Sequence, residues 1–205
     1  MATNTGPRRT PKRRASETIV ASILDAAEGL LLESPLDALT TNKIAKRAGV
    51  SIGSLYQYFP NKQAIIAGIT RRINDRIVAQ LEEVLELPSS AEERVLAATR
   101  AFCSPRTGGP DLRRRLLVEV PRSWDHTAIE RTERRVFELF TPVIAELFPN
   151  LSKNEQDECK LTLLFGVRGA VQGALLYQPE LIENGKLGDI MAAMVRGLIH
   201  EARGS

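Results

Sequence analysis

The sequence predicts an all-α fold of about nine helices, and three observations support this expectation. The 205 residues are 43% hydrophobic, which is enough to bury a core in one large or two small domains. Ala, Leu, Glu, Arg and Ile dominate the middle of the chain, while Gly and Pro fall mostly at the ends of segments. No sustained two-residue alternation of apolar and polar residues appears, so strands have little support.

A basic segment opens the chain. Residues 1–62 hold nine Lys or Arg against five acids, a net charge of +4 in a chain whose total is +3. Five of these positive charges lie in the stretch PRRTPKRR, which contains two prolines and no acid. We therefore expect residues 1–15 to form a disordered basic arm. Such an arm suits contact with a nucleic-acid backbone or minor groove, and the alternative is a solubilising tail.

The first helix is expected at residues 16–33, capped by Ser16 and ended by Ser34 and Pro35. Two short helices and a sharp turn follow. Thr41 is expected to cap the helix over residues 42–48. Gly49 then stands at the turn, where a left-handed conformation favours a residue without Cβ, and Ser51 caps the next helix.

The helix over residues 51–58 has two contrasting faces. Leu55 and Phe59 lie four residues apart and face inward. The outer face is small and polar, while Tyr56 and Tyr58 carry hydroxyls that suit phosphate oxygens. A short helix joined through a glycine turn to such a helix is the helix-turn-helix design, whose second helix enters the DNA major groove. The alternative is an ordinary helical hairpin within an all-helical domain.

The string TT-x-x-IA-x-x-AGVS-x-G-x-LY-x-YF-x-x-K, from Thr40 to Lys62, resembles the signature of the TetR/AcrR family of bacterial transcriptional regulators. The resemblance covers about the first 75 residues. It implies a three-helix DNA-binding domain at residues 16–75, with the helix-turn-helix motif at about 40–59. It also implies that residues 76–205 form a helical ligand-binding and dimerisation domain.

The same resemblance implies roles in binding a palindromic operator in double-stranded DNA. Phosphate contacts are expected from Thr41, Tyr58 and Lys62. The groove-facing positions are Ser51, Ile52, Gly53, Ser54, Tyr56 and Gln57. Since Ile52 and Gly53 offer no hydrogen-bonding side chain, readout of base edges is expected to rest on Asn42, Ser54 and Gln57, with Ile52 available for a thymine methyl.

The next helix is expected at residues 62–87, where apolar residues recur every fourth position from Ile65 to Leu81. This rod is a natural lever between the two halves of the chain, and residues 88–90 mark the boundary. Further helices are expected at residues 91–103, 111–121, 123–148, 153–178 and 184–203. Pro142 is expected to kink or split the third of these.

Small residues suggest an interface between helices. Three glycines within eight residues of one helix cost about 1 kcal/mol each relative to alanine, and close packing is the expected reason. The last helix is apolar over more than one face. The expected interface comprises Gly166, Gly169, Ala170, Gly173, Ala174, Met191, Met194, Val195 and Leu198. Two such helices from each of two chains would form a four-helix homodimer interface, as the resemblance also implies. The alternative is an intramolecular hairpin.

The resemblance further implies an effector pocket among the middle helices. Candidate lining residues are Phe102, Cys103, Leu117, Trp124, Phe137, Phe140, Phe165 and Arg168, and the alternative for the apolar ones is core packing. Arg168 interrupts an apolar helix, so it needs a partner such as Glu138, Glu119, a ligand anion or a residue of a second chain. Arg113 to Arg115 are expected to form a solvated face.

Other functional classes find little support. His126 and His200 lack metal-ligand spacing, no Gly-rich phosphate loop is present, and a dyad of Cys103 with His126 is the weak enzyme alternative. We expect no metal and no cofactor. Apolar runs are shorter than the roughly 20 residues needed to span a bilayer, so a cytoplasmic location is expected. The sequence predicts a homodimeric DNA-binding repressor released by a small, lipophilic effector, or alternatively controlled by a protein partner.

Overall fold

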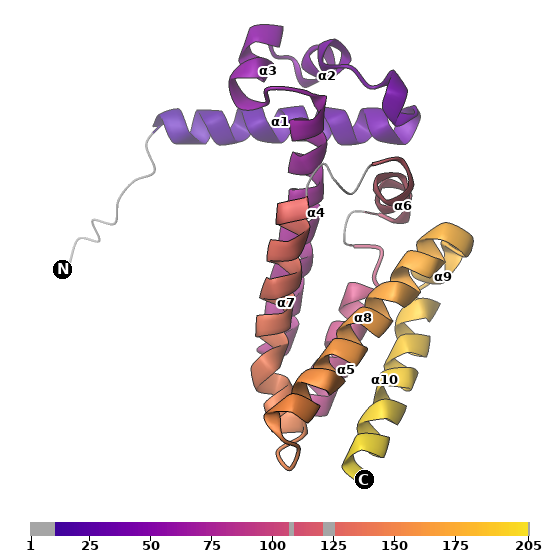
Figure 1. The fold of residues 1–205 in the computed structure, drawn as a ribbon. Coiled ribbons are helices and arrows are strands. Elements are labelled where there is room, and N and C mark those ends of the chain that lie inside the picture. Colours follow the sequence, from indigo (N-terminus) through magenta and orange to yellow (C-terminus); the bar gives the residue numbers. More distant parts are fainter. Residues whose placement is uncertain (1–10, 107–108, 121–125, 205) are drawn as a thin grey trace, which may run out of the picture. The chain divides into compact units, whose positions relative to one another are not determined.

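The computed structural model describes residues 11–106, 109–120 and 126–204, which contain ten α-helices, one short 3-10 helix and no strand. The chain divides into two compact units, Met1–Ile69 and Thr70–Ser205. The boundary falls inside helix α4 (Lys62–Leu85), which therefore belongs to both units. The expectation of an all-α fold is confirmed (Figure 1).

The first unit contains α1 (Pro11–Glu33), η1 (Leu36–Ala38), α2 (Thr41–Ala48), α3 (Ile52–Tyr58) and the start of α4. Helix α1 packs against α2, and α2 packs against α3. Ile23, Ile44, Leu55 and Ile65, one from each α-helix, are completely buried and form the centre of this core. The apolar faces read from the sequence therefore meet in one core.

Helix α1 begins earlier than the sequence predicted. Its first residue is Pro11 rather than Ser16, so residues 11–15 of the predicted arm are helical. Proline suits the first position of a helix because its fixed φ is already helical and the N–H that it lacks has no partner there. Residues 1–10, the rest of that arm, lie outside the described residues.

The turn between α2 and α3 has the predicted geometry. Gly49 adopts φ 69° and ψ 27°, the left-handed conformation. The Ser51 hydroxyl caps α3 by accepting from the Ser54 amide at 3.0 Å. At α2 the cap is Thr40, which accepts from the Lys43 amide at 3.3 Å, and Thr41 is already the first helical residue. The prediction that Thr41 is the cap was therefore wrong by one position.

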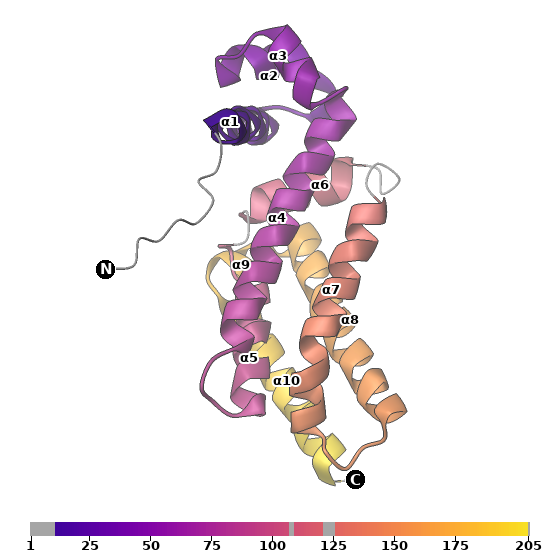
Figure 2. The ribbon, with the colours of Figure 1, turned by 90° about the vertical axis from the view of Figure 1, so that its left-hand side faces the viewer.

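The second unit contains the rest of α4 and six further helices: α5 (Ala91–Phe102), α6 (Pro110–Glu119), α7 (His126–Leu147), α8 (Lys153–Tyr177), α9 (Glu180–Glu183) and α10 (Lys186–Gly204). Helix α7 packs against α5 and α8, while α10 packs against α5, α8 and α9 (Figure 2). Arg135 of α7 also binds Glu82 of α4 at 2.7 Å. Pro142 neither ends nor splits α7, because the helix continues through it to Leu147.

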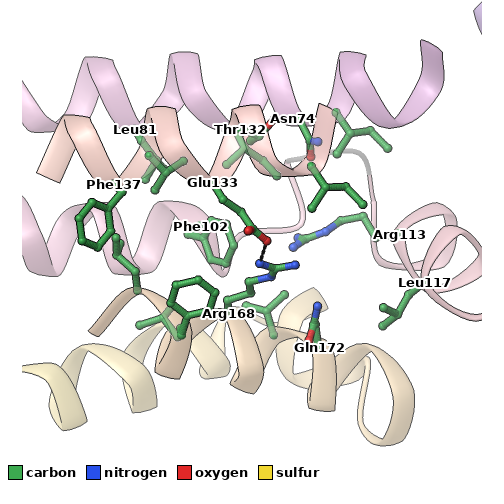
Figure 3. Close-up of a pocket in the computed structure, with 18 of the residues that line it drawn as sticks. Asn74, Leu81, Phe102, Arg113, Leu117, Thr132, Glu133, Phe137, Arg168 and Gln172 are labelled. Atoms are coloured by element: carbon green, nitrogen blue, oxygen red, sulfur yellow. Dashed lines mark hydrogen bonds and ion pairs between the residues drawn. The ribbon is translucent and has the colours of Figure 1, made fainter. Parts of the chain in front are cut away.

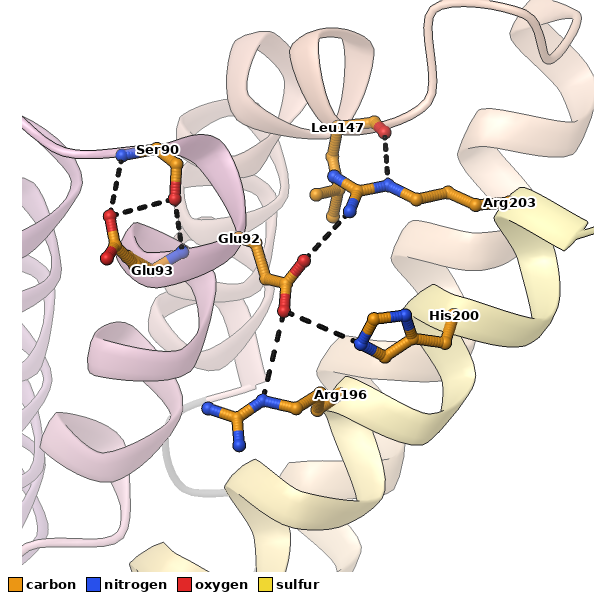
Figure 4. A network of polar contacts seen from close by, with 7 residues as sticks. All are labelled: Ser90, Glu92, Glu93, Leu147, Arg196, His200 and Arg203. Carbon is orange, nitrogen blue, oxygen red and sulfur yellow. Dashed lines mark hydrogen bonds and ion pairs between the residues drawn. The ribbon is translucent and has the colours of Figure 1, made fainter.

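A cluster of charges supplements the packing of α5 against α10. Glu92 accepts a hydrogen bond from Arg203 at 2.8 Å and lies 3.8 Å from Arg196 and 3.9 Å from His200 (Figure 4). At the start of the same helix, Ser90 and Glu93 form a capping box. One carboxylate therefore contacts three basic side chains on successive turns of the last helix.

Helix α8 is the one helix among the described residues that is long and apolar enough to cross a membrane. This differs from the expectation that all apolar runs are too short. The same length and composition also fit a core helix of a water-soluble protein, so this property alone is weak support for a membrane span.

Candidate DNA-binding surface and effector cavity

Helix α3 presents a slim, exposed face. Leu55 is completely buried, whereas Ile52 is 39% and Tyr56 is 50% exposed. Three further residues predicted to face the groove, Ser51, Gly53 and Gln57, are also exposed. Ser54 is half-buried, and its hydroxyl lies 2.8 Å from that of Ser51. The surface thus combines two large side chains with small ones that allow close approach of a partner.

The residues predicted to contact phosphates already have partners within the first unit. The Thr41 hydroxyl lies 3.1 Å from that of Tyr56. Tyr58 donates to the Ser16 hydroxyl at 3.2 Å, and the Lys62 ammonium donates to the Leu36 carbonyl at 3.1 Å. All three predicted residues are half-buried, whereas Asn42 is exposed on α2. Their polar groups therefore orient the helices as well as border the exposed face.

A second site is a cavity of about 310 Å³ within the second unit. Its wall is formed by α4 from Thr70 onward and by α5, α6, α7 and α8. Six of the predicted ligand-binding residues line it: Phe102, Leu117, Phe137, Phe140, Phe165 and Arg168. Trp124 lies outside the described residues. The volume is at the lower end of the range of about 300–1,000 Å³ for small-molecule pockets.

Cys103 does not line this cavity, although it was predicted to do so. Its side chain is 1% exposed, at the end of α5. Burial raises the pKa of the Cys103 thiol to about 11, although the charge of Arg113 acts in the opposite direction. The thiol is therefore protonated at neutral pH, which removes the nucleophile from the weak enzyme alternative.

Three charged residues, Arg113, Glu133 and Arg168, stand in the described wall of the cavity. Figure 3 shows their charged ends pointing toward one another. Arg168 forms an ion pair with Glu133 of α7, rather than with Glu119 or Glu138 as predicted. Glu119 instead binds Arg115 at 3.3 Å.

Arg113 was expected on a solvated face together with Arg114 and Arg115, and this was wrong for Arg113. It lines the cavity, where its guanidinium lies 6.0 Å from the centre of the Phe102 ring. Burial lowers the pKa of the Arg113 guanidinium below its ordinary value. Arginine remains charged in proteins even so. Three successive arginines do not reveal which one a helix turns inward, so the sequence carried no signal for this residue.

An apolar face covers parts of α8 and α10. Of the predicted interface residues, Gly166, Gly169 and Met194 are exposed, and Ala170, Gly173 and Leu198 are half-buried. In contrast, Ala174, Met191 and Val195 belong to the core of the chain itself, so their assignment to an interface was wrong. Further apolar residues of the two helices are exposed as well: Leu161, Phe165, Leu176, Tyr177 and Ile190.

The glycines of α8 do not serve packing within the chain. A Cβ added at Gly166, Gly169 or Gly173 would meet no atom within 4 Å. The prediction of close helix packing therefore finds no intramolecular partner at these positions among the described residues. The face formed by the α8 glycines, Leu161, Phe165, Ile190 and Met194 is referred to below as the α8–α10 face.

Comparison with known proteins finds relatives that cover residues of both units. Residues 23–69 match the family model of bacterial regulatory proteins of the tetR family. The nucleoid occlusion factor SlmA of Vibrio campbellii is 25% identical over 176 residues, covering 83% of this chain and 85% of the relative. An uncharacterised HTH-type transcriptional regulator of Mycobacterium tuberculosis is 28% identical over 169 residues, covering 71% of this chain and 82% of the relative.

Solved structures extend the likeness over the whole fold. A TetR-family transcriptional regulator from Streptomyces coelicolor has a TM-score of 0.67 and 21% identity, covering 91% of this chain and 98% of that one. The regulator FadR from Bacillus subtilis, solved in complex with stearoyl-CoA, has a TM-score of 0.66 and 17% identity, covering 89% of this chain and 96% of that one. At these identities the structures establish the fold.

The capped α2–turn–α3 motif, together with the family match of residues 23–69, defines a DNA-binding transcription regulator of the helix-turn-helix class. Residues 23–69 match the tetR family of bacterial regulatory proteins, and the chain as a whole shares its fold with TetR-family regulators. The family resemblance read from Thr40 to Lys62 is thereby confirmed.

Proposed function

We propose that this protein is a cytoplasmic, homodimeric repressor that a small, lipophilic effector releases from a palindromic operator. The cavity of about 310 Å³ carries this proposal, because most of its wall is aromatic or aliphatic. FadR of Bacillus subtilis, which shares this fold, was solved with stearoyl-CoA, and this supports a lipophilic effector. We propose residues 16–75 as the DNA-binding domain and residues 76–205 as the ligand-binding and dimerisation domain.

On DNA, α3 of each chain would enter the major groove. Two such helices would lie in successive grooves about 34–36 Å apart, which matches one helical turn. The exposed Asn42 and Gln57 would read base edges, with Ser54 beside them and Ile52 against a thymine methyl. Thr41, Tyr58 and Lys62 would hold phosphates at the border of this face, and the basic residues up to Arg14 would add further positive charge.

Helix α4 would transmit the effect of effector binding to the DNA-binding unit, and the DNA would then be released. This helix continues from the first unit into the second, and its residues from Thr70 to Leu81 contribute to the cavity wall. An effector that binds more tightly to the conformation of the dimer that cannot bind DNA than to the conformation that can would increase the population of the former. Moving that population from 1:99 to 99:1 requires a preference of about 10⁴-fold, or about 5.5 kcal/mol.

The DNA-binding part is tested with two substitutions and a DNA fragment obtained by selection from a random pool. Gln57→Ala should relax the base preference at one position in each half-site, since its side chain is exposed on α3. Lys62→Ala should weaken binding to all sequences about equally. Equal loss of base preference in both variants would contradict these roles.

The effector part is tested with a panel of lipophilic compounds and metabolites. A true effector should raise the thermal midpoint by mass action and should release the selected DNA at the same concentration. The likeness to SlmA keeps a second candidate, in which a protein partner controls the DNA-bound dimer. DNA binding that no compound of the panel reverses, together with release by a bacterial protein fraction, would favour that candidate.

A further inference from the structure

We propose that Lys160 is a positioning residue that sets the longest ligand the cavity accepts. Lys160 is not among the described residues of the cavity wall. It acts through the aromatic ring of Phe137, which belongs to the wall and lies toward one end of the cavity (Figure 3). This inference rests on the proposed effector site and adds the means by which that site selects ligands by length.

The burial of Lys160 is the first observation. Among the residues that the structure describes, it is the only charged one that is buried, with 3% of its surface exposed. An ammonium group taken out of water is costly unless it has partners. Lysine is therefore rare in such a position, and its partners show what the charge does there.

The ammonium has three partners, and two of them belong to one turn of α7. It lies 3.8 Å from the centre of the Phe137 ring. It donates to the Thr141 hydroxyl at 2.9 Å, and that hydroxyl donates to the Phe137 carbonyl at 3.0 Å. The third partner is the carboxylate of Asp157 on α8, at 2.7 Å. Lys160 is thus linked to both the ring and the backbone of Phe137.

Phe137 connects these contacts to the cavity. Figure 3 shows its ring toward the same end as Leu81, whereas Arg113 and Leu117 lie toward the other end. A cation over the face of an aromatic ring is attracted by the quadrupole of the ring, most strongly when the cation is removed from water. The ring therefore cannot turn aside for a longer ligand without losing its contact with Lys160. Phe137 is a stop, and Lys160 holds it in place.

The partners of Lys160 permit a substitution that removes the charge and keeps the unbranched side chain. Thr141 is exposed, and the side chain of Asp157 is 45% exposed, so water can satisfy both when the ammonium is lost. Lys160→Met should therefore fold, while the Phe137 ring gains freedom. The matched control is Lys153→Met, because Lys153 is exposed at the start of α8 and lies outside the cavity wall.

The probes are the 1-alkanols from 1-butanol to 1-dodecanol, and titration calorimetry on the purified full-length protein measures their affinities. In the parent protein each added methylene should raise the affinity about fourfold until the chain reaches Phe137, where the gain should stop. In Lys160→Met the gain should extend to a chain at least one carbon longer. Lys153→Met should keep the parent limit. A parent protein without any such limit would overturn the proposal.

A double variant shows whether Lys160 acts through Phe137. Phe137→Ala removes the stop, so the limit should move to a longer chain. Adding Lys160→Met to Phe137→Ala should then change nothing further. Thr141→Val removes one partner of the ammonium and should move the limit in the same direction by less, which keeps the test open if Phe137→Ala does not fold. An unchanged limit in Lys160→Met protein that retains its circular dichroism spectrum, or an additive shift in the double variant, would refute the role of Lys160.

The selected DNA separates this inference from the proposed function. If the alkanols bind and release the DNA but Lys160→Met keeps the parent limit, the effector site stands and the role of Lys160 fails. If the limit moves as expected but no alkanol releases the DNA, the proposed regulation fails while the role of Lys160 stands. A parent protein that binds no alkanol would overturn both.

Discussion

At the scale of single residues, Gly49 makes the turn of the DNA-binding motif possible. Its φ of 69° is a conformation that side chains with a Cβ disfavour, although a Cβ there would meet no atom within 4 Å. Gly49→Ala should therefore destabilise the protein through backbone strain alone, by about 1–2 kcal/mol. The measurement is the free energy of unfolding in urea.

Gly53 provides the matched control for this prediction. It lies inside α3, and the nearest atom to an added Cβ is the Ser51 hydroxyl oxygen at 3.9 Å. Gly53→Ala should leave the stability unchanged or raise it by up to about 1 kcal/mol, the difference in helix propensity. Destabilisation of equal size in both variants would show that strain at Gly49 is not the cause.

The same scale explains what the sequence could and could not predict. Leu55, Phe59 and Gly49 were placed correctly, because helical periodicity and positive φ leave a signal in residue type. Residue type gives no signal that distinguishes Thr40 from Thr41 as the cap, because both are good caps and packing decides the register. Likewise, the Arg168–Glu133 pair depends on how α7 meets α8, which no local pattern specifies.

At the scale of elements, the two capping boxes depend on pH. Ser152 caps α8, and hydrogen bonds from its hydroxyl and amide lower the pKa of Glu155 below the ordinary value of 4.5. Because the pKa in the folded state is lower than in the unfolded state, the contribution to stability is present above pH 4.5. It is lost as the pH falls through the lowered value.

Ser152→Ala tests this dependence. At neutral pH the substitution removes a cap and should lower the thermal midpoint by about 2–4 °C. Well below pH 4.5, where Glu155 is protonated, the difference in midpoint between the variant and the parent protein should shrink. The control is Thr162→Ala, because Thr162 is exposed within α8 and lies beyond its first turn. A difference that stays constant with pH would contradict the role of Glu155.

Some helices and helix boundaries could be predicted from the sequence, and others could not. Long periodic helices such as α4 and α8 were predicted with boundaries near those observed. The four-residue α9 was missed, because one turn of helix has too few residues for a periodic signal. Pro142 was given too much weight, since neighbouring turns and tertiary packing hold α7 continuous.

At the scale of the whole molecule, affinity for DNA should depend strongly on salt. The proposed dimer would make roughly 6–10 phosphate contacts, so the affinity should fall by about 10³ to 10⁵ between 50 and 200 mM salt. Fluorescence anisotropy with the selected DNA at several salt concentrations gives the slope. A flat response would contradict the proposed mode of binding.

The oligomeric state tests the α8–α10 face as the proposed dimer interface. Met194 is 62% and Ile190 is 50% exposed, so arginine at both positions would place two charges on an apolar surface without filling the core of the chain. If this face joins two chains, the double variant Ile190→Arg with Met194→Arg should sediment as a monomer at micromolar concentration. Burying two unpaired like charges near a two-fold axis is strongly unfavourable.

Val118→Arg is the control for this experiment, because Val118 is 58% exposed on α6 and does not line the cavity. It should sediment like the parent protein. The monomeric variant should keep its helical content but bind the palindromic DNA far more weakly, since only one α3 would be engaged at a time and the gain from linking two half-sites would be lost. A monomeric parent protein, or a double variant that stays dimeric, would move the interface away from α8 and α10.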